Sequence, residues 1–185
     1  MKKIAIISDS LIGGGIEQVS IALAEAFKKN NLEVHIILLK NAVAPGLLKK
    51  FHIHVLSEDG KITKISKLRP YLFSKKIKRL NKEFDFDIVL SNLADFAGMK
   101  TVELVGFKNL YTIIHNTQSK RRFKRHQKKG FSVLKAYKLH KIRESFKNKK
   151  LLCVSKGVED DLLQIIKAKP QYIVSLRQHS STLYF

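Results

Sequence analysis

The sequence predicts a doubly wound α/β fold built on a parallel sheet. Short β-rich runs alternate with amphipathic helical stretches along nearly the whole chain of 185 residues. The first two β-rich runs are joined by one helical stretch, and a strand-helix-strand unit of this kind requires parallel strands. No apolar run approaches the roughly 20 residues of a membrane-spanning helix, so we expect a globular protein.

The opening strand-helix-strand unit shows the alternation most clearly. Residues 3–8 form a compact β-rich run, typical of a strand buried on both faces, and residues 11–15 form a glycine-rich turn. From Ile16 the apolar residues recur at helical spacing until the polar run 28–31 closes the helix. A second strand is expected at 33–39. The predicted apolar stripe of the helix is Val19, Ala22, Leu23, Ala26 and Phe27.

The remaining elements repeat this alternation less cleanly. We expect strands at 51–56, 87–91, 109–115, 151–155 and 172–175, and helices at 68–84, 96–105 and 158–167. A long basic segment, 117–150, is expected to be helical from Val133 onward. Residues 1–175 are predicted to form one domain, and residues 176–185 read as a tail without an apolar period.

The net positive charge of the chain is unusually large for its length. Thirty-six basic residues against fifteen acidic ones give a net charge of +21, which implies a polyanionic partner, either nucleic acid or an anionic membrane face. The stretch from Lys120 to Lys150 contains a single acidic residue, Glu144, and carries interleaved aromatic and aliphatic residues. Such a stretch suits a lipid headgroup boundary or single-stranded nucleic acid equally well. Its first cluster is Lys120, Arg121, Arg122, Lys124, Arg125, Lys128 and Lys129.

The glycine-rich turn is the first candidate ligand site. Gly13, Gly14 and Gly15 let the backbone approach a ligand closely, and the helix that carries Glu17 aims free N–H groups at that place. The turn lacks the Gly-Lys-Ser/Thr of a phosphate-binding P-loop, and the third glycine of a dinucleotide fingerprint would fall at Gln18. By motif alone, a ligand-free structural turn is as good an explanation.

A histidine at the end of the fifth predicted strand is the second candidate. His115, followed by Asn116, is placed to hydrogen-bond a sugar hydroxyl or to transfer a proton, although a histidine satisfied by backbone groups is the favoured reading from this residue alone. The other histidines do not have metal-ligand spacing, so no metal or cofactor is expected. The single cysteine, Cys153, reads as a small core residue.

Four stretches of sequence together carry a family resemblance. They are Gly13-Gly14-Gly15-Ile16-Glu17, Asp87-Ile88-Val89-Leu90-Ser91, Ile113-Ile114-His115-Asn116, and the run from Cys153 to Leu162, Cys-Val-Ser-Lys-Gly-Val-Glu-Asp-Asp-Leu. In order and spacing this set resembles the amino-terminal, Rossmann-like domain of GT-B glycosyltransferases of family 4. The resemblance covers about residues 1–175.

The resemblance implies an activity and roles for residues. Members of the family carry two Rossmann-like domains with the active site between them, the first holding the acceptor and the second the nucleotide sugar. The glycine turn with Glu17 would face the donor phosphates or the acceptor, together with Asn116 and Ser155, and His115 would be the catalytic residue. The implied reaction transfers a sugar from a nucleotide-sugar donor to a lipid-linked or glycan acceptor in bacterial capsule, lipopolysaccharide or glycolipid synthesis.

The same resemblance bears on the basic segment. It favours an anionic membrane surface over nucleic acid as partner of Lys120–Lys129, and a cytoplasmic protein that is peripheral on the inner face of the membrane. A basic nucleic-acid-binding protein, or a membrane-surface module without catalysis, remains the alternative.

Residues 176–185 depart from the family pattern. The family continues after the last strand with a hinge into its donor-binding domain, whereas this tail shows no hinge motif. We therefore expect the donor-binding domain and its pair of glutamates to be absent. The chain is then expected to be inactive alone, or to need a separate donor-binding chain.

Overall fold

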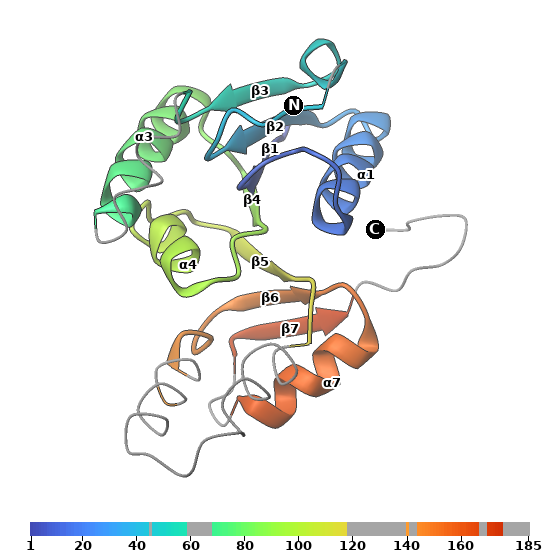
Figure 1. Ribbon diagram of the computed structural model, residues 1–185, viewed down its shortest axis with the longest axis vertical. Coiled ribbons are helices and arrows are strands. Elements are labelled where there is room, and N and C mark those ends of the chain that lie inside the picture. The colour runs from blue at the N-terminus through green and yellow to red at the C-terminus, as the bar shows by residue number, and fades with distance from the viewer. Residues whose placement is uncertain (45, 59–67, 118–139, 141–143, 167–169, 176–185) are drawn as a thin grey trace. The chain divides into compact units, whose positions relative to one another are not determined.

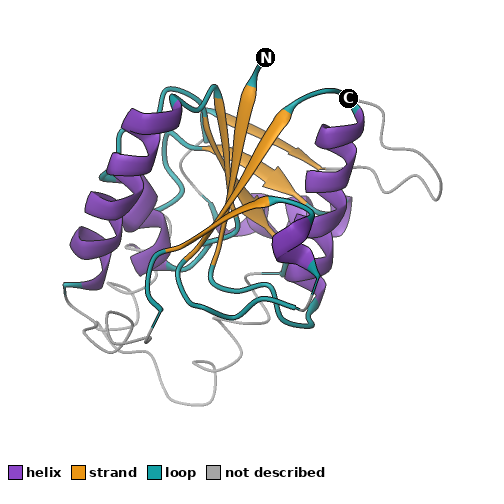
Figure 2. Ribbon diagram, turned by 90° about the horizontal axis from the view of Figure 1, so that it is seen from above, coloured by secondary structure: helices purple, strands orange, loops and turns teal. Residues whose placement is uncertain are grey.

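The computed structural model describes residues 1–44, 46–58, 68–117, 140, 144–166 and 170–175 (Figure 1). In these residues seven strands follow the order β3-β2-β1-β4-β5-β6-β7. The chain divides into two compact units, residues 1–111 and 112–185, and the boundary falls inside β5. Figure 2 shows the strands in orange and the helices in purple. The predicted parallel α/β fold is confirmed.

The observed bounds agree with the expected ones to within a few residues. The strands are β1 (Lys3–Ser8), β2 (Glu33–Leu38), β3 (His52–Val55), β4 (Ile88–Ser91), β5 (Leu110–Ile114), β6 (Lys150–Cys153) and β7 (Tyr172–Ser175). The helices are α1 (Gly15–Lys29), α3 (Arg69–Phe84), α4 (Phe96–Glu103) and α7 (Lys156–Ile165), with a short 3-10 turn η1 (Leu47–Lys49) that the pattern did not predict.

The sheet of unit 1 is parallel and covered on both faces. Ala5 of β1 lies in register with His35 of β2 on one side and with Val89 of β4 on the other. Helix α1 lies on one face of these strands, and α3 and α4 lie on the other (Figure 1). Because both faces are covered, β1 is apolar along nearly its whole length, as the sequence predicted.

The buried stripe of α1 differs from the prediction. The structure buries Ser20, Leu23, Ala24 and Phe27 and leaves Ala22 exposed. Ser20 is buried with its hydroxyl hydrogen-bonded to Asn92 and to the Ile16 carbonyl, and a prediction from apolar spacing does not count a serine as buried.

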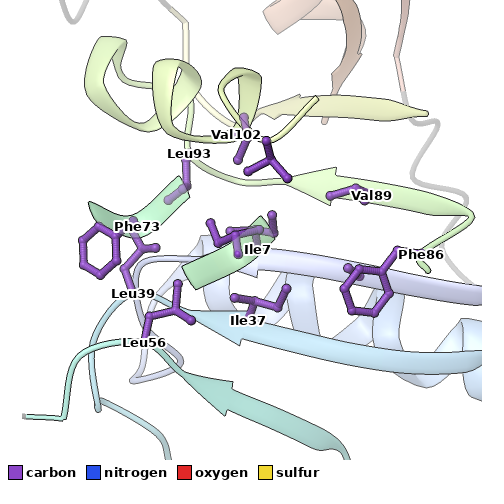
Figure 3. Close-up of a cluster of buried hydrophobic side chains, with 12 residues drawn as sticks. Ile7, Ile37, Leu39, Leu56, Phe73, Phe86, Val89, Leu93 and Val102 are labelled. Carbon is purple, nitrogen blue, oxygen red and sulfur yellow. The ribbon is translucent and has the colours of Figure 1, made fainter. Parts of the chain in front are cut away.

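The core of unit 1 lies between the strands and the helices α3 and α4. Ile7 and Ile37 come from the sheet, Phe73 from α3 and Val102 from α4, and their side chains point toward one another (Figure 3). Phe73 is fully buried. This packing fixes the first turn of α3 against the carboxyl ends of the strands, where ligands bind in sheets of this type.

Unit 2 contains the end of β5 together with β6, α7 and β7. Strands β6 and β7 are parallel, with Leu151 opposite Ile173, and α7 buries Val158, Leu162 and Ile165. Residues 118–139 and 141–143 of the basic segment lie outside the described residues, as does the tail 176–185. The helix expected from Val133 was predicted too long, because residues 145–148 form turns and β6 begins at Lys150. In the described part of the chain, no helix has the length and hydrophobicity needed to cross a bilayer.

Candidate functional site

The glycine turn follows β1 in unit 1 and leads directly into α1. Gly13 has φ +50°, in the left-handed region that favours glycine, and Gly14 is the N-cap of α1 with an extended backbone. A Cβ on Gly15 would meet nothing within 4 Å. The positive φ at Gly13 is therefore the conformational requirement for glycine in this turn.

Gly14 has an extended backbone, so glycine is not required there by conformation. A Cβ at this position would come close to Glu17 Oε2, because the Glu17 carboxylate folds back over the start of α1, and this flexible side-chain end would have to move aside. The Ser10 hydroxyl donates to Glu17 Oε1 at 3.4 Å. The positive end of the α1 dipole thus already has a carboxylate beside it, and a ligand at this turn would meet both that carboxylate and backbone N–H groups.

A buried polar network ties α1 to the sheet just below this turn. The Asn92 amide nitrogen donates to Ser8 Oγ at 2.8 Å and to Ser20 Oγ at 2.7 Å, and Ser20 Oγ donates to the Ile16 carbonyl at 2.8 Å. All three polar side chains are buried. The network holds the first turns of α1 in place, and the sequence argument did not find it because its members are distant along the chain.

A charged cluster lies at the same edge of unit 1. Lys40 Nζ pairs with Asp9 Oδ2, and Arg69 Nη2 pairs with Asp9 Oδ1 at 3.1 Å. Asp9 follows β1, Lys40 follows β2, and Arg69 opens α3. The sequence analysis did not single out any of these residues, since Arg69 is 60 positions from Asp9 and only the fold brings them together.

Unit 2 brings His115, Asn116 and Ser155 to one edge. The Val154 N–H donates to the Ile114 carbonyl at 3.1 Å. The residues that follow β5 and those that follow β6 therefore start from neighbouring positions. His115 and Asn116 continue from Ile114, and Ser155 continues from Val154. His115 is half-buried, whereas Asn116 and Ser155 are exposed. Three of the residues named from the sequence therefore lie together at the ends of neighbouring strands.

Ser155 also has a structural role that the sequence argument missed. It is the N-cap of α7, and its hydroxyl accepts a hydrogen bond from the Val158 N–H at 3.4 Å. Two residues before it, Cys153 is fully buried, and burial raises the pKa of its thiol to about 12. The thiol therefore stays protonated, which excludes it as a nucleophile near neutral pH and confirms the core interpretation.

A second cluster of titratable groups lies away from these sites, near the amino end of β2. His35 is buried, with its Nδ1 2.9 Å from His54 Nε2 and its Nε2 2.8 Å from Glu33 Oε1. Among the described residues, no group of three or more histidine, cysteine or acidic side chains has the arrangement of a metal site.

The predicted sites are thus divided between the two units. The glycine turn and Glu17 belong to unit 1, and His115, Asn116 and Ser155 belong to unit 2. The proposed membrane-docking residues, Lys120, Arg121, Arg122, Lys124, Arg125, Lys128 and Lys129, lie outside the described residues.

Comparison with known families decides the classification. The sequence model of Glycosyltransferase Family 4 matches residues 13–175, which is most of the chain and includes the glycine turn, His115 and Ser155. The chain belongs to glycosyltransferase family 4. No curated protein sequence matches this family 4 chain significantly.

Solved structures show where such a fold occurs. The chain is similar to a sucrose-phosphate synthase from Thermosynechococcus elongatus, with a TM-score of 0.69 and 16% identity over 95% of this chain and 48% of that one. It is also similar to the lipopolysaccharide outer core galactosyltransferase WaaB, with a TM-score of 0.61 and 17% identity over 95% of this chain and 47% of that one. A third similar structure is a glycosyltransferase from Rickettsia africae, with a TM-score of 0.61 and 19% identity over 95% of this chain and 42% of that one.

These similarities concern the fold. At such low identities they show that the family 4 chain shares the Rossmann-like architecture of GT-B glycosyltransferases. The chain spans about half the length of each of these structures.

Proposed function

We propose that this chain forms the acceptor-side half of a glycosyltransferase. The reaction would move a sugar from a nucleotide-sugar donor to a lipid-linked or glycan acceptor, in the synthesis of a bacterial polysaccharide, lipopolysaccharide or glycolipid. The observation that carries the proposal is the family match over residues 13–175, since that range includes every candidate site residue at a strand end.

The residues have separate tasks in this proposal. The glycine turn admits the polar part of a ligand to the start of α1, where Glu17 accepts hydrogen bonds from sugar hydroxyls. His115 contacts the transferred sugar at the reaction centre, and Asn116 and Ser155 line the adjoining edge. The donor-binding glutamates would come from a donor-binding domain or a separate chain, and residues 1–175 would not complete a transfer site without them.

The proposal includes a membrane-bound acceptor. The basic cluster Lys120–Lys129 would bind anionic lipid from the cytoplasmic side. Support within the described residues comes from α3, which exposes five basic side chains: Lys75, Lys76, Lys78, Arg79 and Lys82. Exposed apolar residues, Tyr71 and Leu72, lie at the amino end of the same helix. A basic helix with apolar side chains at one end suits a negatively charged headgroup layer.

A gene-deletion experiment tests the proposed function in the cell, where any partner chain is present. Loss of the gene should remove one sugar residue, and everything added after it, from a surface glycan or glycolipid, as measured by mass spectrometry. The wild-type gene should restore the product, and His115→Ala should not.

His52→Ala is the matched control, because His52 is an exposed histidine on β3 outside the candidate site. It should restore the product fully. An unchanged glycan and glycolipid profile in the deletion strain would refute the proposed function. Full restoration by His115→Ala would remove the role given to that histidine.

A further inference from the structure

Three charged side chains from distant parts of the sequence meet at the carboxyl ends of β1 and β2. Lys40 forms an ion pair with one oxygen of the Asp9 carboxylate, and Arg69 forms an ion pair with the other. Asp9 and Lys40 are each 41% exposed, and Arg69 is 23% exposed, so the cluster is open to a ligand from solvent. An exposed ion pair contributes about 0–1 kcal/mol to stability, so folding alone gives little reason to gather these three groups.

The charges in this cluster do not balance. Two cations face one carboxylate, and Arg69 lies in the first turn of α3, where the helix dipole adds about half a positive charge. That turn contains no acidic residue, and its N-cap, Leu68, provides no side-chain cap. The cluster therefore carries a positive surplus at the edge where ligands bind in parallel sheets.

Within the part of the chain that the structure describes, Lys40 and Arg69 each make one side-chain hydrogen bond, to Asp9, and keep further donors unused. A lysine ammonium has three donors and an arginine guanidinium five, and in the described residues Asp9 is the acidic partner of both. The Arg69 guanidinium lies 5.9 Å from the centre of the Phe73 ring, and Phe73 is fully buried, so the guanidinium is held by a rigid support. Two further carboxylates, Glu17 in the first turn of α1 and Glu58 after β3, have other partners: Glu17 with Ser10, and Glu58 with Asn41.

We propose that Lys40 and Arg69 form a binding site for a phosphoryl group carried by the acceptor, with Asp9 holding the two cations in place while the site is empty. The identification of the ligand as the acceptor rests on the proposed function, whereas the binding of a phosphoryl group does not. The phosphoryl group would belong to a sugar phosphate or to a lipid headgroup. Arginine and lysine together suit this ligand because they offer paired and single N–H donors to its oxygens.

Titration of the isotope-labelled full chain by NMR tests the proposal without any transfer reaction. Glucose 6-phosphate is the probe, and glucose is the uncharged control. The phosphate should shift the backbone amide signals of Ser10, Asn41 and Tyr71 saturably, and glucose at the same concentrations should not. Arg69→Gln and Lys40→Gln should each weaken binding by about tenfold, since a charge-assisted hydrogen bond is lost.

Removal of the carboxylate gives the opposite result and separates a ligand site from a structural salt bridge. Asp9→Asn should tighten phosphate binding by about fivefold, because one negative charge next to the ligand is lost. Lys29→Gln and Lys108→Gln, at exposed lysines outside both α3 and the cluster, are the matched controls and should leave the affinity unchanged. Each variant's amide spectrum reports directly whether it is folded.

A second ligand distinguishes the two sources of the phosphoryl group. Soluble dihexanoyl phosphatidic acid is titrated below its micelle concentration. If the phosphoryl group belongs to a lipid headgroup, this lipid should shift the same amides and bind more tightly than glucose 6-phosphate. If the phosphoryl group belongs to a sugar phosphate, the lipid should bind more weakly than glucose 6-phosphate. Either order of affinities supports the site. The proposal is overturned if neither ligand shifts these amides, if Lys40→Gln and Lys29→Gln weaken binding equally, or if Asp9→Asn weakens it.

Discussion

Gly98 and Gly157 each lie in the first turn of a helix but have opposite surroundings. A Cβ on Gly98 would lie 2.5 Å from Leu93 Cβ and 2.5 Å from Asp95 Oδ1, whereas a Cβ on Gly157 would meet nothing within 4 Å. We expect Gly98→Ala to lower the free energy of unfolding by about 1–3 kcal/mol through overpacking. Gly157→Ala should be neutral or should raise it by up to about 1 kcal/mol. Urea unfolding measures both, and a Gly98→Ala variant as stable as wild type would contradict the close packing of α4.

The histidine cluster near the amino end of β2 predicts a pH dependence of stability. Burial lowers the pKa of His54, the charge of His35 lowers it further, and Glu83 partly opposes both. His52 also faces His54, and Lys3 lies near Glu33. Because the folded pKa of His54 is below the unfolded one, the unfolded state binds more protons as pH falls through the ordinary histidine range, and stability is lost there.

Replacement of His54 should remove part of this dependence. The free energy of unfolding of the wild type should fall as the pH is lowered through the ordinary titration range of histidine, and His54→Asn should reduce that fall. His52→Asn is the control, because His52 is exposed. The hydrogen bond from His35 keeps the pKa of Glu33 low, so its contribution is lost at more acidic pH than that of His54, as the pH falls from the usual range of a glutamate to below the lowered pKa. An equal fall in wild type and His54→Asn would exclude His54 as its source.

At the scale of elements, the stability of Ser155 variants tests the structural role of this residue as the N-cap of α7. Its hydroxyl caps α7, so Ser155→Ala should destabilise the chain by about 1 kcal/mol, and Ser155→Asp should keep the cap. Asp95→Ala, which removes the cap of α4, is the comparison and should cost a similar amount. Thermal unfolding of the three variants measures this. If Ser155→Ala were as stable as wild type, the cap would be energetically unimportant.

The elements that were predicted well are those whose signal is local. Strand β1 and the helix after it are recognisable because a compact β-rich run is followed by a glycine turn and then by helical spacing. The burial of Ser20 on α1 was not predicted, since its hydrogen-bond partner Asn92 lies 72 positions away in the sequence. The Asp9–Arg69 pair was missed for the same reason. Contacts of this kind come from the crossover topology and leave no periodicity in the sequence.

The candidate site was predicted in part. His115 and Asn116 were named from a strand end and Ser155 from the family resemblance, and the three lie together because the carboxyl ends of neighbouring parallel strands meet at one edge of a sheet. The position of the Glu17 carboxylate over Gly14 was not predicted, because helical spacing does not indicate which way a side chain in the first turn of a helix folds.

At the scale of the whole molecule, the net charge of +21 implies a polyanionic partner, and the proposed function makes that partner an anionic membrane. Replacement of Lys120, Arg121, Arg122, Lys124 and Arg125 by glutamine should sharply weaken sedimentation with anionic vesicles, since each basic residue near such a surface contributes about 1 kcal/mol. The same number of replacements on α3, at Lys75, Lys76, Lys78, Arg79 and Lys82, is the matched variant. If only the α3 variant lost binding, the docking surface would be α3; if neither did, the charge would serve another partner.

The central claim, that this chain is the acceptor-side half of a glycosyltransferase, is tested most directly by reconstitution. Membranes and cytosol from a strain that lacks the gene are supplied with radiolabelled nucleotide sugars, and label is counted in the lipid and glycan fractions. Added purified chain should restore incorporation of one sugar, as should His52→Ala, whereas His115→Ala should not. If the extract of the deletion strain incorporates every sugar as well as a wild-type extract does, and the added chain changes nothing, the claim is contradicted.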